Sequence, residues 1–419
     1  MNMADRLLDT RPLRTSAVFR RLWAGNALST VGGQLTVVAV LFQMWELTGS
    51  PVAVGAIGLV QAAAMVLFGL LGGVLADAVD RRRLVLLTTV IQLLSAGLLA
   101  VHSASGAASM WGLLALTALQ TAGSGLGAPA RKTFVVRLLP ADQVGAGIAL
   151  TNLAFQAALL IGPAIAGVVV AQWGVAACYL VDALTFAAAL YGVLRLPAMR
   201  PQGETARPGA RAIWEGWRFI IGKPLLHGAL LSDALATVTA MPVALFPLIN
   251  SERFGGRPET LGLFFSAVAV GGLAAGAASG MVTRARRPGA VMLAAAGAWG
   301  LALAGFGLAQ PLWLALTCLT AAGAADTTSV ITRGAIVQLV TPDTHRGRVS
   351  AVDHIAGVAG PELGNFRGGL VAGATSAAFA ALSGGVLCVA GIVVLALTNT
   401  PLRRFKTAAP ELPDPQPGR

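Results

Sequence analysis

The chain has 419 residues, of which 56% are hydrophobic and only 11% are charged, and its mean hydropathy is +0.74. This composition is too apolar for a water-soluble globular domain and predicts an integral membrane protein. The net charge of +12 does not indicate nucleic acid, because the basic residues lie in short clusters between apolar runs without interleaved aromatic residues. We therefore expect the lipid bilayer around this chain and no nucleic-acid partner.

Three cysteines, Cys178, Cys318 and Cys388, stand alone within apolar segments. Their odd number and their spacing predict neither a disulfide nor a metal site. The sequence shows no nucleophile set and no phosphate-binding Gly-x-x-x-x-Gly-Lys-Ser/Thr segment, which argues against an enzyme and against direct use of ATP. We expect no cofactor.

Apolar runs of about 20 residues, the length that a bilayer core requires, recur along the whole chain. After a basic arm at 1–21, six predicted helices lie near 22–47, 52–76, 84–104, 109–130, 143–171 and 175–195. A polar linker at 196–224, with a short amphipathic helix around Trp214–Phe219, cannot cross a membrane. Six more predicted helices lie near 226–249, 259–282, 289–309, 312–338, 349–374 and 378–398, before a tail at 399–419. The pattern predicts an all-α polytopic protein with twelve transmembrane helices, in bundles at 22–195 and 225–398.

The basic residues predict the orientation of this layout. Of the 30 Lys and Arg residues, only Arg253 and Arg257 fall in loops on one side, and Arg333 and Arg367 fall within predicted helices. All the others lie in segments on the opposite side, which the positive-inside rule makes cytoplasmic. We expect a multi-pass protein of the inner (plasma) membrane, with both termini in the cytoplasm.

The two halves of the sequence also resemble each other. An offset of 202 residues aligns Arg131 with Arg333 and Pro140 with Pro342. The same offset aligns Gly162 with Gly364 and Gly167 with Gly369. Since the offset is close to half the chain, it favours two parallel six-helix repeats with a binding site between them, as in a carrier.

The loop between the second and third predicted helices reads Gly73-x-Leu75-x-Asp77-x-x-Asp80-Arg81-Arg82. It resembles the corresponding loop of the major facilitator superfamily, usually Gly-x-Leu-x-Asp-Arg-x-Gly-Arg-Arg. Ala78 and Asp80 depart from that pattern, and the second-half copy at 280–287 lacks the acid. The resemblance implies a cytoplasmic gate, in which Asp77 pairs with basic residues such as Arg346 or Arg348; the alternative is a topological signal alone.

The fifth predicted helix contains Gly162-Pro163-Ala164-Ile165-Ala166-Gly167, which resembles the Gly-Pro-x-x-Gly-Gly signature of antiporters in that superfamily. Segments such as Phe19-Arg20-x-Leu22-Trp23 and Gly347-Arg348-Val349 are similar to the branch that contains the enterobactin exporters and the macrolide and multidrug efflux proteins. This resemblance implies a secondary exporter of an amphipathic small molecule, such as a siderophore or drug, driven by proton antiport. Proton-coupled uptake and uncoupled facilitated diffusion are the alternatives. We expect a monomer.

Charged side chains inside a membrane are costly, so each is a candidate for function. Four acids of the second half are candidates for proton coupling: Asp233, Asp326, Asp353 and Glu362. The alternative is simple pairing, of Asp326 with Arg333 or Arg367 and of Glu362 with the other arginine. The two arginines are also candidate anchors for an anionic substrate. Five amide side chains of the first half are candidates for lining the same cavity: Gln34, Gln61, Gln120, Asn152 and Gln156.

Overall fold

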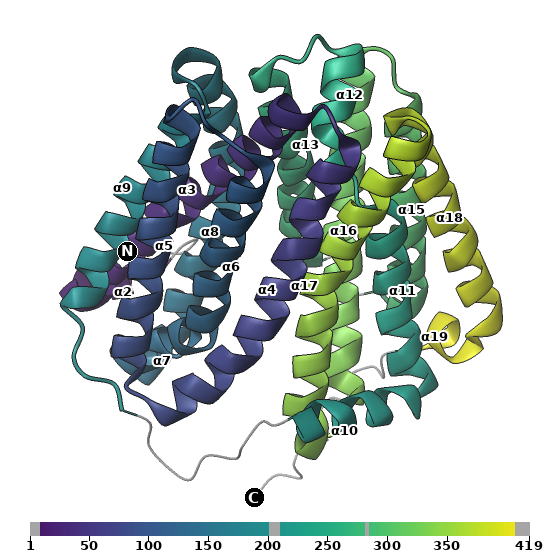
Figure 1. Ribbon diagram of the computed structural model, residues 1–419. Coiled ribbons are helices and arrows are strands. Elements are labelled where there is room, and N and C mark those ends of the chain that lie inside the picture. The colour runs from purple at the N-terminus through teal and green to yellow at the C-terminus, as the bar shows by residue number, and fades with distance from the viewer. Residues whose placement is uncertain (1–8, 201–209, 281–284, 407–419) are drawn as a thin grey trace, which may run out of the picture.

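A computed structural model describes residues 9–200, 210–280 and 285–406. Within these ranges the regular structure is entirely helical, as the sequence predicts. Figure 1 shows two groups of long helices side by side, one before and one after the segment that joins α9 to α10. Cys178, Cys318 and Cys388 are free thiols, and Cys178 and Cys388 are buried.

The first group follows the predicted elements within a few residues. Its helices are α2 (Arg11–Thr15), α3 (Ala17–Thr48), α4 (Pro51–Ala78), α5 (Arg81–Ala104), α6 (Met110–Lys132), α7 (Phe134–Leu138), α8 (Ala141–Trp173) and α9 (Val175–Leu194). Several starts carry the expected local chemistry, because Ser16, Ser50 and Ser109 each accept a hydrogen bond from a backbone N–H of the first turn.

The second group begins with the predicted amphipathic helix. Its helices are α10 (Ala210–Ile221), α11 (Pro224–Ala240), the 3₁₀ turn η1 (Val243–Leu245), α12 (Phe246–Arg253), α13 (Pro258–Ala277), α15 (Pro288–Leu308), α16 (Leu312–Val340), α17 (Asp343–Ala374), α18 (Ala377–Thr398) and α19 (Thr400–Arg404). α10 lies across one end of this group, where it packs on α17 (Figure 1).

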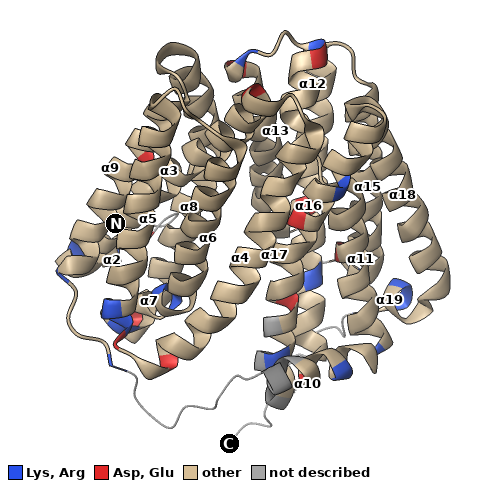
Figure 2. Ribbon diagram, viewed as in Figure 1, with Lys and Arg blue, Asp and Glu red and all other residues tan. Residues whose placement is uncertain are grey.

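Ten of the described spans are long and apolar enough to cross a membrane. α6 and α17 are as long as the others, with 23 and 32 residues, but they are more polar. Charged residues gather mainly at the ends of the helices, and few lie at mid-height (Figure 2). The chain is therefore a multi-pass membrane protein.

The predicted helix at 226–249 is wrong in one respect, because the chain breaks its α-helix in the middle. α11 ends at Ala240, Met241 is extended, and the chain continues as η1 and α12. Pro242 has no N–H to continue the helix, and the Asn365 side chain accepts a hydrogen bond from the Ala244 N–H at 3.2 Å. Because α17 supplies that acceptor, the break is fixed by the neighbouring helix.

The two groups meet along α4 with α17 and along α8 with α13. The close approaches lie toward one end: a Cβ on Gly369 would be 2.5 Å from the Pro51 carbonyl oxygen, and one on Gly262 would be 2.4 Å from the Pro163 carbonyl oxygen. Pro51 begins α4, Gly369 is near the end of α17, and Gly262 is near the start of α13. These contacts close the end of the molecule opposite α10.

Replacing Gly369 by Ala is expected to open this seam, because its Cβ would clash with the backbone of α4. Gly368→Ala is a matched control, since a Cβ there has no neighbour nearer than 3.6 Å. We expect Gly369→Ala to increase the distance between spin labels on α4 and α17 at this end, measured by pulsed electron paramagnetic resonance. Equal distance distributions for the two variants would contradict the prediction.

Candidate substrate cavity and charged cluster

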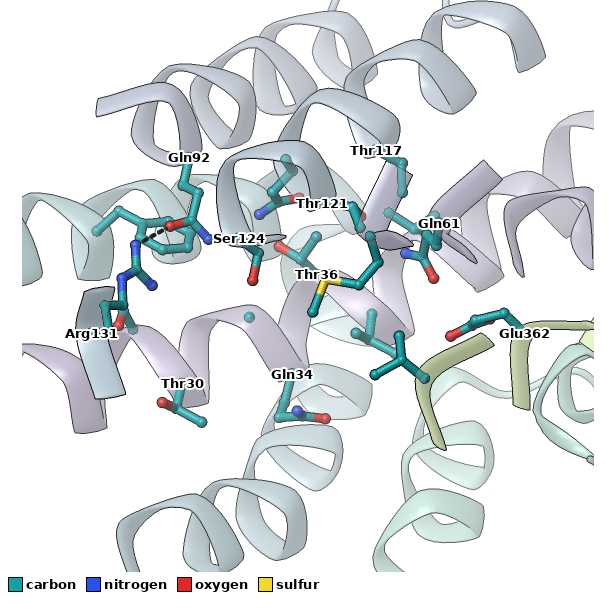
Figure 3. A pocket seen from close by; sticks show the side chains of 18 residues that line it. Thr30, Gln34, Thr36, Gln61, Gln92, Thr117, Thr121, Ser124, Arg131 and Glu362 are labelled. Atoms are coloured by element: carbon teal, nitrogen blue, oxygen red, sulfur yellow. Dashed lines mark hydrogen bonds between the residues drawn. The ribbon is translucent and has the colours of Figure 1, made fainter. Parts of the chain in front are cut away.

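A polar cavity of about 390 Å³ lies between the two groups of helices. Its wall combines amides from four helices of the first group: Gln34, Gln61, Gln92 and Gln120. Hydroxyl groups complete the polar lining: Ser29, Thr30, Thr36, Thr117, Thr121 and Ser124. Figure 3 shows several of these side chains turned toward one another around the hollow. Such a wall offers many donors and acceptors to a small molecule.

The cavity places three of the five predicted amides together and adds one that the sequence reading missed. Gln34, Gln61 and Gln120 line it, whereas Asn152 and Gln156 are not among its lining residues. Gln92, from α5, was missed, although a Thr pair one turn earlier and Ser95 one turn later could have marked a polar face.

Arg131 also lines the cavity, which corrects its assignment to a cytoplasmic loop. It lies in the last turn of α6, one residue beyond the predicted helix end. Its Nη2 donates to Gln92 Oε1 at 2.5 Å and to Thr89 Oγ1 at 3.3 Å on α5. These are neutral acceptors, and no ion pair joins Arg131 to an acid in the part of the chain that the structure describes.

Among the described residues that line the cavity, the single acid is Glu362, which comes from α17 in the second group. Arg131 and Glu362 stand at opposite ends of the cluster of side chains in Figure 3. Glu362 accepts a hydrogen bond from Asn365 Nδ2 at 3.1 Å, one turn along the same helix. The cavity thus has a cationic end and an anionic end.

A second charged cluster lies where α11, α16 and α17 pack together. Arg333 of α16 lies 3.5 Å from Asp233 of α11, and its other terminal nitrogen donates a short hydrogen bond to Asp353 of α17. Arg333 and Asp233 are each 8% exposed, and no described residue donates a hydrogen bond to the buried Oδ2 of Asp233. One cation therefore serves two acids, so the cluster carries a formal negative charge when both are ionised.

The alternative of simple pairing, of Asp326 and Glu362 with the two arginines, is not found in the described structure. Asp326 and Glu362 form no ion pair with Arg333 or Arg367 among the described residues. Arg367 instead donates to the Thr239 carbonyl oxygen at 2.5 Å. Asp326 lies two turns from Arg333 on the same face of α16, about 10 Å along the axis. Neither Arg333 nor Arg367 is among the residues that line the polar cavity.

The antiporter-like segment of α8 lies where that helix contacts both groups. A Cβ on Gly162 would be 2.5 Å from the Gln34 side chain of α3, and a Cβ on Gly167 would be 2.8 Å from the Pro258 carbonyl oxygen of α13. Between them, the Pro163 carbonyl faces Gly262. The small residues of this segment permit the close packing of α8 that shapes the cavity.

The loop that resembles the superfamily signature makes its ion pair and its hydrogen bonds within the first half of the molecule. Asp77 lies 3.6 Å from Arg81, one turn away, and Arg82 donates to the Leu194 carbonyl oxygen of α9 at 2.6 Å. Gly73 faces open space, whereas Gly72 is the residue that packs closely on α6. Across the molecule, Arg348 lies 3.2 Å from Glu215 of α10. The Arg346 side chain is outside the described part of the chain.

Asp80 caps α5 and connects it to the segment after α9. Its side chain accepts hydrogen bonds from the Arg82 N–H at 2.9 Å and the Met199 N–H at 3.2 Å. Partial burial acts to raise the pKa of Asp80, but these amides, the Arg83 amide and the Arg83 charge together lower it. The carboxylate is thus the form that the folded protein favours.

Asp80→Ala is expected to lower the stability of the protein by about 1 kcal/mol, the usual cost of losing an N-cap. Because the folded pKa is the lower one, the contribution of Asp80 is complete above the unfolded carboxyl value of about 4 and is lost as pH falls through the folded value. Thermal unfolding in detergent at pH 7 and at acidic pH measures this, with Asp77→Asn as the control. A midpoint difference between wild type and Asp80→Ala that persists unchanged at acidic pH would contradict it.

Comparison with known proteins agrees with this geometry. The family model described as transmembrane secretion effector matches residues 9–417. The chain belongs to this family of major facilitator transporters. It is a membrane transport protein and not an enzyme.

Individual relatives show the same fold and the same class. Enterobactin exporter EntS of Shigella boydii and that of Escherichia coli are each 28% identical over 414 residues, covering 98% of this chain and 99% of theirs. The crystal structure of nucleoside transporter NupG matches with a TM-score of 0.71 at 14% identity, covering 93% of this chain and 100% of NupG. A bacterial homologue of the human lysosomal transporter Spinster matches with a TM-score of 0.69 at 16% identity, covering 92% and 95%. The resemblance to the superfamily is confirmed.

Proposed function

We propose that this protein exports an amphipathic small molecule, such as a siderophore or drug-like compound, in exchange for protons. The observation that carries the proposal is the polar cavity between two helical groups, closed at one end by backbone contacts, with Arg131 and Glu362 at its ends. The similarity to enterobactin exporters supports export and a siderophore-like cargo.

Twelve crossings in two six-helix repeats, at 22–195 and 225–398, fit this carrier. At 1.5 Å per residue, even the 23 residues of α6 are long enough for a core of about 30 Å. α6 falls short in hydropathy because it carries polar side chains of the cavity wall, and α17 because it carries charged residues such as Asp353, Glu362 and Arg367. The packing also repeats: α3 contacts α8 and α9, and α11 contacts α17 and α18.

The basic residues support an orientation with both termini in the cytoplasm of the inner membrane. In that orientation the glycine contacts of Gly369 and Gly262 close the external side, and the cavity opens inward. Cargo then enters from the cytoplasm, and the external seam opens to release it. The Asp77–Arg83 loop would bind the second half only after the cytoplasmic side closes, as expected of a gate.

The charged cluster of α11, α16 and α17 supplies proton coupling in this proposal. Arg333 can neutralise only one of its two acidic partners, Asp233 and Asp353, so one negative charge remains in excess. Asp326 is a third acid, and it forms no ion pair within the described ranges. A proton on any of them relieves the excess negative charge. Movement of α17 during alternating access would separate Asp353 from Arg333 and change that proton affinity. No cofactor is needed, since the proton gradient supplies the energy.

Transport in everted membrane vesicles tests the proposed function. With enterobactin as the first cargo and ethidium as a drug-like cargo, vesicles containing the protein should accumulate substrate only when their interior is acidic. A protonophore should abolish accumulation. Cargo entry that persists with the protonophore and stops at equal concentrations on both sides would show uncoupled transport, and accumulation only in right-side-out cells would show uptake.

Asp326→Asn should separate coupling from transport in the same vesicles. We expect Asp326→Asn still to move cargo across the membrane. Its gradient-driven accumulation should fall at least tenfold, because one proton-binding group is gone. Asp142→Asn on the exposed first turn of α8 is the control, and it should behave as wild type. If Asp326→Asn accumulates cargo normally, Asp326 carries no coupled proton.

A further inference from the structure

One acid of the first group has no place in the coupling cluster. Asp182 of α9 is completely buried, at 0% exposure. Its Oδ2 accepts hydrogen bonds from Thr36 Oγ1 at 2.7 Å and from Gln120 Nε2 at 2.8 Å. Both donors line the polar cavity, so Asp182 lies one side chain behind the cavity wall.

Among the residues that the structure describes, nothing donates a hydrogen bond to the second oxygen of Asp182, Oδ1. Oδ1 is buried next to the glycine of α3 that makes space for it. A Cβ on Gly32 would lie 2.7 Å from Oδ1 and 2.2 Å from the Thr185 hydroxyl. The Thr185 hydroxyl, which donates to the Asp182 backbone carbonyl oxygen at 2.7 Å, lies against the same glycine.

The charges around Asp182 leave it unbalanced. No ion pair joins it to a cation in the described part of the chain. The helices that pack around Asp182 carry their charged groups near their ends. On α9 itself, the other titratable groups are Cys178 and the two tyrosines. The charged and titratable groups of these helices are Arg20, Arg21 and Glu46 on α3, Arg81, Arg82, Arg83 and His102 on α5, Arg131 and Lys132 on α6, Asp142 on α8, and Cys178, Tyr179 and Tyr191 on α9. An ionised carboxylate buried without a cation is unfavourable, and proton binding removes that penalty.

We propose that Asp182 is a proton-binding site whose charge state sets the hydrogen-bonding character of the cavity wall. An ionised carboxylate only accepts hydrogen bonds, so it holds the Gln120 amide with its NH₂ turned away from the cavity and its carbonyl oxygen available. A proton from water on Oδ1 makes the group neutral and weakens its hold on Gln120 and Thr36. The amide is then free to turn, and the cavity loses a fixed acceptor.

This proton-binding site adds to the export mechanism proposed above, and its role in transport rests on that proposed function. A cargo donor, such as a hydroxyl or amide N–H, binds the carbonyl oxygen of Gln120 when Asp182 is ionised. Protonation of Asp182 removes that orientation and disfavours the cargo. Proton and cargo therefore compete, which is the requirement for exchange transport. The first group of helices then takes part in coupling as well as in forming the cavity.

Infrared pH titration of the purified protein in lipid nanodiscs tests the proposal with protons alone. Wild type should show a carboxylic acid C=O band that grows as pH falls and that is partly missing in Asp182→Asn. Glu46→Gln, at the end of α3, should keep that component. Identical difference spectra for wild type and Asp182→Asn at every pH would overturn the proposal.

Gln120→Leu provides a second test that does not alter the acid. Removing one donor to the carboxylate should raise the titration midpoint of the Asp182 band by about one pH unit or more. An unchanged midpoint would overturn the link between Asp182 and the cavity wall. Because the titration uses neither cargo nor a gradient, its outcome is independent of the vesicle experiment that tests export.

Discussion

Arg333→Gln is expected to destabilise the protein more than any other single change in the charged cluster. It leaves Asp233, which is 8% exposed, and Asp353 facing each other without a cation. Removing one partner of a buried ion pair typically costs about 3–5 kcal/mol. The thermal unfolding midpoint in detergent should fall sharply, and proton-driven accumulation should be lost.

The double variant Arg333→Gln/Asp233→Asn shows whether charge balance is the cause. It removes one acid together with the cation, so much of the stability should return while coupling stays impaired. Arg367→Gln is the matched control, because Arg367 donates to a backbone carbonyl at 2.5 Å and pairs with no acid among the described residues. If Arg367→Gln lowers the midpoint as much as Arg333→Gln, the cluster is not held by charge pairing.

Most of the fold could be predicted from hydropathy alone, because ten of the described spans are long apolar runs. Helices such as α4 and α15 begin at prolines, Pro51 and Pro288, which fit the first helical turn and mark a boundary in the sequence. The break after Ala240 was not predicted, since a proline inside an apolar run is compatible with a kinked helix. The Asn365 side chain that supports the break comes from a helix more than 100 residues later.

The candidate site was only partly predictable for a related reason. Polar residues within apolar runs identify candidates such as Gln34 and Glu362, but not which of them face the same space. The partners of Arg333 depend on how α11, α16 and α17 pack, and no spacing along the chain encodes that packing. Arg131 was assigned to a loop because an arginine at the end of an apolar run usually reaches the membrane surface. Here Gln92 and Thr89 of α5 hold it inward.

Arg131→Gln is expected to remove the preference of the cavity for anions. In wild type the guanidinium is the only cation of the cavity wall in the described structure, and its partners there are neutral. A hydrogen bond to a charged group contributes about 1.5–3 kcal/mol, so affinity for an anionic ligand should fall roughly 10- to 150-fold. Salicylate and its neutral analogue salicylamide provide a matched pair of probes, with binding measured by calorimetry on the purified protein.

Two further variants separate the charge of Arg131 from its structural contacts. Gln92→Ala removes the 2.5 Å hydrogen bond between α5 and α6 but keeps the guanidinium, so salicylate should still bind better than salicylamide. Arg131→Lys keeps the charge but loses the planar fork, and it should give an intermediate preference. If Gln92→Ala abolishes the preference as completely as Arg131→Gln does, Arg131 acts by joining two helices. A preference retained by Gln92→Ala and lost in Arg131→Gln would assign the cationic end of the cavity to cargo recognition.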